Sequence, residues 1–188
     1  VICAKNFAPM NHPRLSKSQK RLRKMSEDPK YLTDGTLSKL AKWLRMAGYD
    51  TIVYPHEAGR DMLNLANSEK RIVLTKRRNM LERKFSGRLY FVKSNDLGGQ
   101  LREVISEFSL TIKKEKMYSI CLKCNEKLHP VEKDEVCNLV PPYVFACCSA
   151  YNKCPGCQRI YWEGTHRRNS LQFLKELSIY PHEKSLHK

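Results

Sequence analysis

The chain has 188 residues, of which 41% are hydrophobic, so it can bury the core of one ordinary domain or of two small ones. No stretch approaches the roughly 18 uncharged apolar residues that a membrane helix needs, and no signal peptide is visible, so we expect no membrane partner. The 35 lysines and arginines exceed the 19 acids and give a net charge of +16. Solubility of a small domain needs only about 2 to 8 net charges, so this surplus favours a polyanionic partner.

Residues 1–30 are predicted to be a basic extension, with eight lysines and arginines, two acids and three prolines. Five of these basic residues are expected to contact RNA phosphates, namely Lys17, Lys20, Arg21, Arg23 and Lys24. The alternative is a leader segment without any role in RNA binding. Under either interpretation, the composition predicts little regular structure in the absence of a partner.

Residues 31–110 predict an α/β domain in which strands alternate with helices. Apolar stretches predict strands at 31–33, 51–54, 72–75 and 89–92. Apolar residues at helical spacing predict helices around 37–44, 62–66, 80–81 and 101–108, and Gly48 is placed to end the first of them. This alternation predicts a parallel sheet with helices on its faces, whose functional groups gather at the carboxyl ends of the strands.

The remainder of the chain predicts a smaller second unit. Residues 111–117 form a charged connector, and residues 118–168 contain most of the cysteines. Apolar residues at helical spacing predict a closing helix at 170–178, within a C-terminal helix and tail that span residues 169–188.

Two Cys-x-x-Cys pairs, Cys121 with Cys124 and Cys154 with Cys157, are separated by 29 residues. Each pair predicts a tight knuckle whose backbone amides point at the thiolates. Together the pairs offer four sulfur ligands in the tetrahedral arrangement that suits zinc, so we expect a small zinc ribbon with a structural metal ion. An iron–sulfur cluster and a redox-active dithiol are less favoured alternatives.

The other cysteines are Cys3, Cys137, Cys147 and Cys148, and none occurs between residues 4 and 120. Secreted disulfide scaffolds spread their cysteines along the chain, so this distribution predicts a reducing, intracellular compartment. Cys147 and Cys148 are either replacement ligands for the metal or, as we favour, small buried apolar residues beside Phe145.

Carboxylates follow two of the predicted strands and lie near the start of the second helix. Asp34 follows the first strand, Asp96 follows the fourth, and Glu57 and Asp61 lie near the second helix. Carboxylates that converge at one edge of a parallel sheet can hold Mg²⁺ or Mn²⁺ for phosphodiester cleavage. The alternative is that Asp34 and Asp61 cap helices and that Asp96 is a turn residue.

Four stretches of the chain resemble, in the same order, motifs of the C-terminal RNase domain of Mut-seven-type exonucleases. They are residues 32–50, 72–77, 100–104 and 154–166. The resemblance covers about residues 31–168 and implies a PIN-like nuclease fold followed by a zinc ribbon, with RNA as the substrate class. Asp34, Asp61 and Asp96 fall at positions where the resemblance implies catalytic acids.

One departure from the family pattern follows the third strand. The family has Thr-Arg-Asp there, with the Asp as a metal-site acid, whereas this chain has Thr75-Lys76-Arg77-Arg78. An arginine at this position has the wrong charge and would compete with Mg²⁺ by pairing with the remaining carboxylates. Because residues 70–88 contain eight lysines and arginines, we instead expect Lys76, Arg77 and Arg78 to contact RNA.

Arg167 and Arg168 are expected to contact phosphates as well. Beside them, Trp162 and His166 are candidates to stack on a base or to approach a phosphate. The alternative, which we favour for the aromatic rings, is that Tyr161 and Trp162 pack the ribbon against the sheet domain. The basic residues of the first helix are expected to form an ordinary solvated face, and they are Lys39, Lys42 and Arg45.

These observations predict an RNA-binding, non-catalytic component of a ribonucleoprotein particle such as a ribosome, with rRNA or another structured RNA and other proteins as its partners. The alternative is a metal-dependent ribonuclease that acts in RNA processing or decay. A zinc ribbon that binds only proteins is a third hypothesis, but it leaves the +16 charge unexplained. The basic leader and the initial Val1 slightly favour a mitochondrion or another organelle over the cytoplasm or nucleus.

Overall fold

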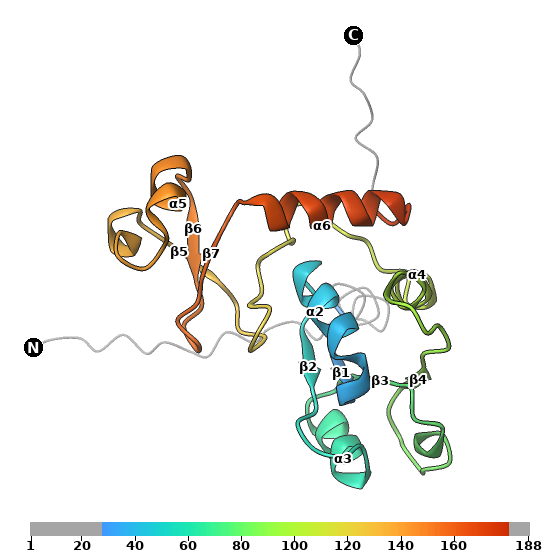
Figure 1. Cartoon of the computed structure of the whole chain (residues 1–188). Helices are drawn as coiled ribbons and strands as arrows, with labels where there is room; N and C mark the ends of the chain where they lie inside the picture. The colour runs from blue at the N-terminus through green and yellow to red at the C-terminus, as the bar shows by residue number, and fades with distance from the viewer. Residues whose placement is uncertain (1–27, 181–188) are drawn as a thin grey trace, which may run out of the picture.

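The computed structural model describes residues 28–180 of the chain (Figure 1). The predicted RNA contacts of the basic extension, Lys17, Lys20, Arg21, Arg23 and Lys24, lie outside the described residues, as does the tail at 181–188. Within the described part, none of the helices has the length and apolar character needed to cross a membrane.

A parallel sheet of four short strands forms the centre of the larger domain, as the sequence predicts. Its strands are β1 (Tyr31–Thr33), β2 (Thr51–Val53), β3 (Ile72–Thr75) and β4 (Leu89–Phe91). They lie in the order β2-β1-β3-β4, and every neighbouring pair is parallel. The carboxyl ends of β1, β3 and β4 therefore meet at one edge, which we call the sheet edge.

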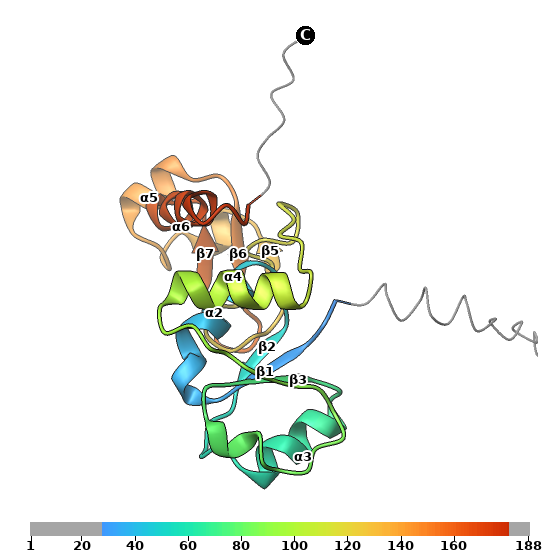
Figure 2. The same ribbon diagram turned by 90° about the vertical axis from the view of Figure 1, so that its right-hand side faces the viewer.

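Helices cover both faces of this sheet. Figure 2 shows α2 (Ser38–Met46) and α4 (Leu97–Glu107) on one face and α3 (Arg60–Ser68) on the other. Successive residues of β1 supply the two cores, because side chains alternate along a strand: Tyr31 packs in the cluster with α2 and α4, and Leu32 packs with α3. Short 3₁₀ turns, η1 (Gly35–Leu37) and η2 (Arg78–Met80), follow β1 and β3.

The smaller unit is a three-stranded antiparallel ribbon. It contains β5 (His129–Val131), β6 (Tyr151–Lys153) and β7 (Ile160–Trp162), in the order β5-β6-β7. The turn η3 (Asp134–Val136) and the helix α5 (Pro142–Cys147) lie between β5 and β6. Tyr151 is buried in the ribbon's own small core, and its hydroxyl donates to the Val144 carbonyl at 3.0 Å.

The closing helix, α6 (Thr165–Glu176), begins five residues earlier than the predicted 170–178, so Arg167 and Arg168 lie on it. It leaves the ribbon after β7 and crosses over α2 toward α4 (Figure 1). Leu174 is buried in the core that α2 and α4 share, and the ring of Phe173 lies 4.8 Å from that of Trp43. The helix therefore packs against the larger domain as well as following the ribbon in sequence.

The expectation that Arg45 lies on a solvated face is wrong. Arg45 is only 6% exposed, and its Nε donates to the Thr51 carbonyl at 2.6 Å. Its Nη1 donates to the carbonyls of Leu122 and Lys123, at 3.0 and 2.9 Å. Since Leu122 and Lys123 lie between the first two cysteines of the ribbon, this one guanidinium joins α2 and β2 to the first knuckle.

Asn125 makes a second link between the same elements. Its side-chain oxygen accepts from the Thr51 backbone N–H at 2.8 Å, and its amide nitrogen donates to Asp50 at 2.5 Å. Arg71 donates to the same carboxylate at 2.6 Å. Burial raises the pKa of the Asp50 carboxyl, but the hydrogen bonds from Arg71 and Asn125 outweigh burial and hold this pKa below its ordinary value.

We expect Arg45→Met to lower the free energy of unfolding by about 3 kcal/mol, because it removes charge-assisted hydrogen bonds and leaves three carbonyls without their donor. The matched control is Lys39→Met on the same helix, where the exposed side chain makes the expected change less than about 0.5 kcal/mol. Urea titration followed by tryptophan fluorescence measures both. Equal effects of the two substitutions would contradict the role assigned to Arg45.

Candidate metal centre and sheet-edge site

The two Cys-x-x-Cys pairs fold into knuckles of the same backbone geometry. In the first, the N–H of Asn125 donates to the Cys121 carbonyl at 3.1 Å, and in the second the N–H of Gln158 donates to the Cys154 carbonyl at 3.0 Å. Asn125 and Gln158 have φ angles of +68° and +59°. Asparagine tolerates this left-handed conformation better than most residues. Each turn brings the two cysteine sulfurs of its pair close together.

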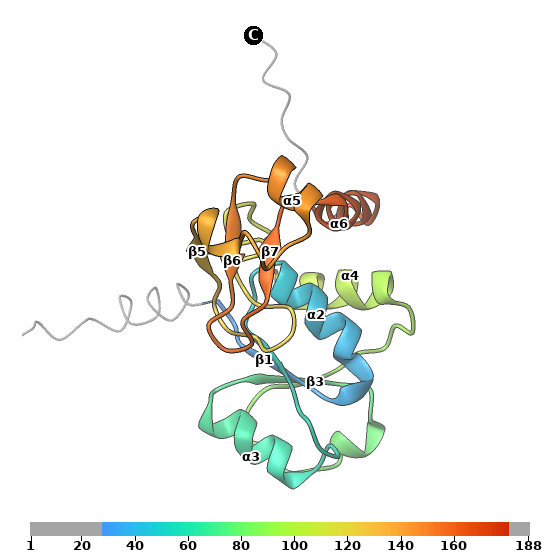
Figure 3. The ribbon, with the colours of Figure 1, turned by 60° about the vertical axis from the view of Figure 1, so that its left-hand side comes forward.

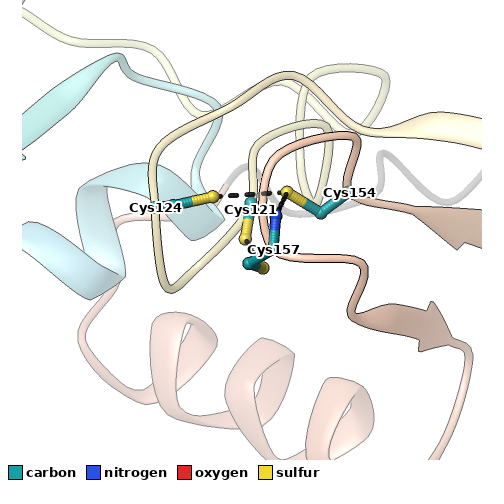
Figure 4. A group of neighbouring side chains, drawn as sticks. All are labelled: Cys121, Cys124, Cys154 and Cys157. Atoms are coloured by element: carbon teal, nitrogen blue, oxygen red, sulfur yellow. Dashed lines mark hydrogen bonds between the residues drawn. The ribbon is translucent and has the colours of Figure 1, made fainter.

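The four sulfur atoms, from Cys121, Cys124, Cys154 and Cys157, lie within 4.8 Å of one another (Figure 4). The sulfurs of Cys121 and Cys157 are 3.5 Å apart, and those of Cys124 and Cys154 are 3.2 Å apart. A tetrahedral ion with metal–sulfur bonds of about 2.3 Å places its ligands roughly 3.8 Å apart, so this set fits a metal ion such as zinc.

Burial and hydrogen bonding affect these thiols differently. Burial disfavours the Cys121 thiolate, but the Tyr161 hydroxyl, 3.1 Å away, and nearby backbone N–H groups stabilise it and lower the pKa to about 6. Burial raises the pKa of Cys154 to about 12. A bound cation would favour the thiolate at both positions, because metal ligation requires the deprotonated sulfur.

The remaining cysteines of the described chain lie outside this cluster. Cys137 and Cys147 are exposed and Cys148 is half-buried, so the expectation that Cys147 is a buried apolar residue is wrong. In residues 28–180, the four knuckle cysteines are the one group of three or more potential metal ligands that come close together. The interpretation of Cys147 or Cys148 as a replacement ligand therefore has no geometric support.

Asp34 lies at the sheet edge, directly after β1, and is 1% exposed. One carboxylate oxygen accepts from the Thr36 N–H at 2.9 Å and from the Thr36 hydroxyl, which makes Asp34 the N-cap of η1. The other accepts from the Thr75 hydroxyl at 2.5 Å and from the Lys76 N–H at 3.2 Å. The first oxygen thus holds the turn η1, and the second ties the end of β1 to the end of β3.

The other predicted acids do not join Asp34. Asp61 lies in the first turn of α3, where a negative charge suits the helix dipole. Asp96 is the N-cap of α4, and the N–H of Gly99 donates to it at 2.8 Å and lowers the pKa of its carboxyl. In the described chain, no three carboxylates come as close together as the four cysteines do, and the catalytic role of Asp34, Asp61 and Asp96 stays a prediction.

Two of the predicted RNA contacts are occupied within the protein. The ammonium of Lys76 donates to the Ser94 carbonyl at 2.8 Å and to the Asn95 side chain at 2.6 Å. Arg77 pairs with Glu57 at 3.2 Å. Glu103, which the sequence did not single out, accepts from the N–H of Ser94 at 2.9 Å and so fixes the loop that binds Lys76.

The other three predicted contacts differ in exposure. Arg78 is exposed, and its guanidinium lies 6.0 Å from the ring centre of Phe91. Arg167 pairs with Glu163 and stacks over the ring of Tyr118 at 4.8 Å. Arg168 is exposed on α6. Arg78 and Arg168 therefore remain the most accessible members of the predicted set within the described residues.

A parallel α/β domain with Asp34 at its sheet edge, joined to a ribbon whose four clustered cysteines could hold a metal ion, is the arrangement of a nuclease-like protein. Residues 29–174 match the Mut7-C RNAse domain family. The match covers more than half of the chain, so the protein belongs to this family, and the resemblance seen in the sequence is confirmed. No significant match was found among curated proteins or among solved structures.

We expect Cys154→Ala to lose the bound metal ion, because three thiolates and an apolar side chain cannot complete the tetrahedral set. Elemental analysis of the purified full chain, after gel filtration in reducing buffer, measures the metal content per chain. Cys137→Ala is the matched control and should retain the metal, since Cys137 is exposed and outside the cluster. Equal metal content in the two variants would refute the four-sulfur site.

Proposed function

We propose that the protein binds RNA and that its PIN-like domain serves as a non-catalytic scaffold within a ribonucleoprotein particle such as a ribosome. Membership of the Mut7-C RNAse domain family supports RNA as the partner. The net charge of +16 supports binding through phosphates, because each neutralised phosphate releases condensed counterions.

The observation that best supports the non-catalytic role is that the acidic side chains at the sheet edge are already bound by other groups of the protein. Both oxygens of Asp34 are occupied by Thr36, Thr75 and the Lys76 backbone, and Glu57 is paired with Arg77. The Lys76 ammonium is bound by oxygens of the loop after β4. The Lys76 ammonium and the Arg77 guanidinium thus stand at an edge where Mg²⁺ or Mn²⁺ would need free carboxylate oxygens, and both cations would repel either ion.

We propose zinc as the ion of the four-cysteine centre. Four thiolates with no open position favour a structural zinc ion, which supplies folding free energy and takes no part in chemistry. A reducing, intracellular compartment would keep these sulfurs available as ligands. In this proposal the centre holds the ribbon in shape next to the larger domain.

A metal-dependent ribonuclease is the second candidate, and one observation favours it. Asp34 keeps its place at the end of the central strand β1, where the resemblance implies a catalytic acid. Activity would require Thr36 and Thr75 to release its carboxylate and Arg77 to leave Glu57, so that oxygens become free for Mg²⁺ or Mn²⁺.

We expect the purified full chain to bind labelled RNA without cutting it when Mg²⁺ or Mn²⁺ is added. Binding should weaken steeply with salt, because the affinity comes largely from phosphate contacts. Fluorescence anisotropy at several salt concentrations measures binding, and gel electrophoresis of the same RNA measures cleavage.

Asp34→Asn is the control for cleavage, since it removes the negative charge while keeping the shape of the side chain. Metal-dependent cleavage by the wild-type protein that disappears in Asp34→Asn would overturn the non-catalytic role and establish the ribonuclease. Cleavage that persists in Asp34→Asn would identify a contaminating nuclease, which further purification must remove. Absence of RNA binding under all salt conditions would refute the proposal as a whole.

A further inference from the structure

A cleft of about 1440 Å³ lies between α2, α6, the first knuckle and strand β7. In Figure 3, α6 is seen end-on beside the ribbon, with α2 below it. The cleft exceeds the roughly 300 to 1,000 Å³ of typical small-molecule pockets, so its size suits a segment of a polymer. Its lining residues include none of the predicted catalytic acids.

Positive charge dominates the lining of this cleft. It contains six lysines and arginines, namely Lys42, Lys114, Lys123, Arg159, Arg167 and Arg168, and one acid, Glu163, which pairs with Arg167. The other five basic side chains are exposed and form no ion pair with the described part of the chain. Unpaired charges of one sign around a cleft concentrate the electrostatic field and attract an anion.

An exposed aromatic ring accompanies these charges. Tyr143, on α5, lines the cleft and is 71% exposed, the highest value among the exposed large hydrophobic residues. The other aromatic residues at the cleft have packing partners: Trp43 contacts Phe173, and the Tyr161 hydroxyl contacts Cys121. A free aromatic face beside unpaired cations is the combination that single-stranded nucleic acids use, with bases stacking and phosphates pairing.

Hydrogen bonds between and within the two units hold the walls of the cleft in place. Arg45 binds the carbonyls of Leu122 and Lys123, so the Lys123 side chain projects from a fixed backbone. The Tyr118 hydroxyl donates to the Arg167 carbonyl at 3.2 Å and attaches the start of α6 to the chain just before the first knuckle. A surface that is rigid before binding loses less conformational entropy when its ligand arrives.

We infer that this cleft binds a single-stranded segment of RNA, with phosphates on Lys42, Lys123 and Arg159 and a base on Tyr143. This inference rests on the proposed RNA-binding function and names the surface responsible for it. A duplex is a poor fit for such a site, because its bases are stacked inside the helix and cannot reach a side-chain ring. At the sheet edge, in contrast, Lys76 and Arg77 already have partners within the protein.

The first experiment compares two triple variants of the full chain that remove the same charge. The cleft variant is Lys42→Ala, Lys123→Ala and Arg159→Ala, and the control is Lys39→Ala, Arg102→Ala and Lys113→Ala, all exposed residues that do not line the cleft. Anisotropy with labelled single-stranded RNA should show at least tenfold weaker binding for the cleft variant. Its log–log salt slope should fall by about 2, at roughly 0.7 for each lost phosphate contact.

The second experiment tests the stacked base. Tyr143→Ala should weaken binding of single-stranded RNA by roughly 5- to 150-fold, the effect of losing one stacked base, with little change in salt slope. Tyr143→Phe should restore binding because it restores the ring. Leu139→Ala is the control, since Leu139 is 59% exposed in the same unit and does not line the cleft.

The outcomes separate this inference from the function on which it rests. Normal RNA binding by the wild type with equal losses in both triple variants would overturn the cleft and indicate diffuse electrostatic attraction. Preference for duplex over single-stranded RNA would overturn it as well. Failure of the wild type to bind any RNA would refute the proposed function itself, and the cleft assignment with it.

Discussion

The buried guanidinium of Arg45 is the contact on which the arrangement of the two units depends. Burial disfavours this charge and lowers the pKa of Arg45, while negative charge on the nearby sulfurs of Cys121 and Cys124 would act in the opposite direction. Three backbone carbonyls, those of Thr51, Leu122 and Lys123, accept its hydrogen bonds. Because a divalent ion with four thiolates keeps a net negative charge, metal binding in the knuckles would also stabilise the cation that docks them.

The secondary structure of the larger domain could be predicted because local pattern and burial agree there. Tyr31 and Leu32 are adjacent apolar residues, and each packs on a different face of the sheet, as expected for a strand covered by helices on both sides. The spacing of the four cysteines likewise predicted their cluster. The burial of Arg45 could not be predicted, because its partners Leu122 and Lys123 lie 77 and 78 residues away in sequence and only the tertiary fold brings them together.

The sequence predicted where the sheet edge lies, but it did not predict which contacts the side chains at this edge make. The sequence placed Asp34 after the first strand. It did not predict that the hydroxyl of Thr75, 41 residues later, donates a hydrogen bond to the Asp34 carboxylate. The basic run after β3 predicted RNA contacts from composition alone. Composition does not distinguish a basic side chain that faces solvent from one that is paired within the protein. The Lys76 ammonium donates to the backbone of another loop, and Arg77 forms an ion pair with Glu57. Lys123 and Arg159 were not singled out from the sequence, because Lys123 lies between two cysteines and Arg159 two residues after another, where ligand spacing dominated the interpretation.

The sheet edge and the cleft use separate residues, and this separation makes loss of catalysis compatible with retained RNA binding. A nuclease needs free acids and a metal ion at the same place as the phosphate, whereas a binding protein needs only cations and stacking surfaces. Arg77 pairs with Glu57 at the edge and does not line the cleft, whose lining includes residues of α2, α5, β7, α6 and the knuckles. A change of acid to arginine after β3 could therefore remove the chemistry while the docked ribbon preserves a surface for RNA.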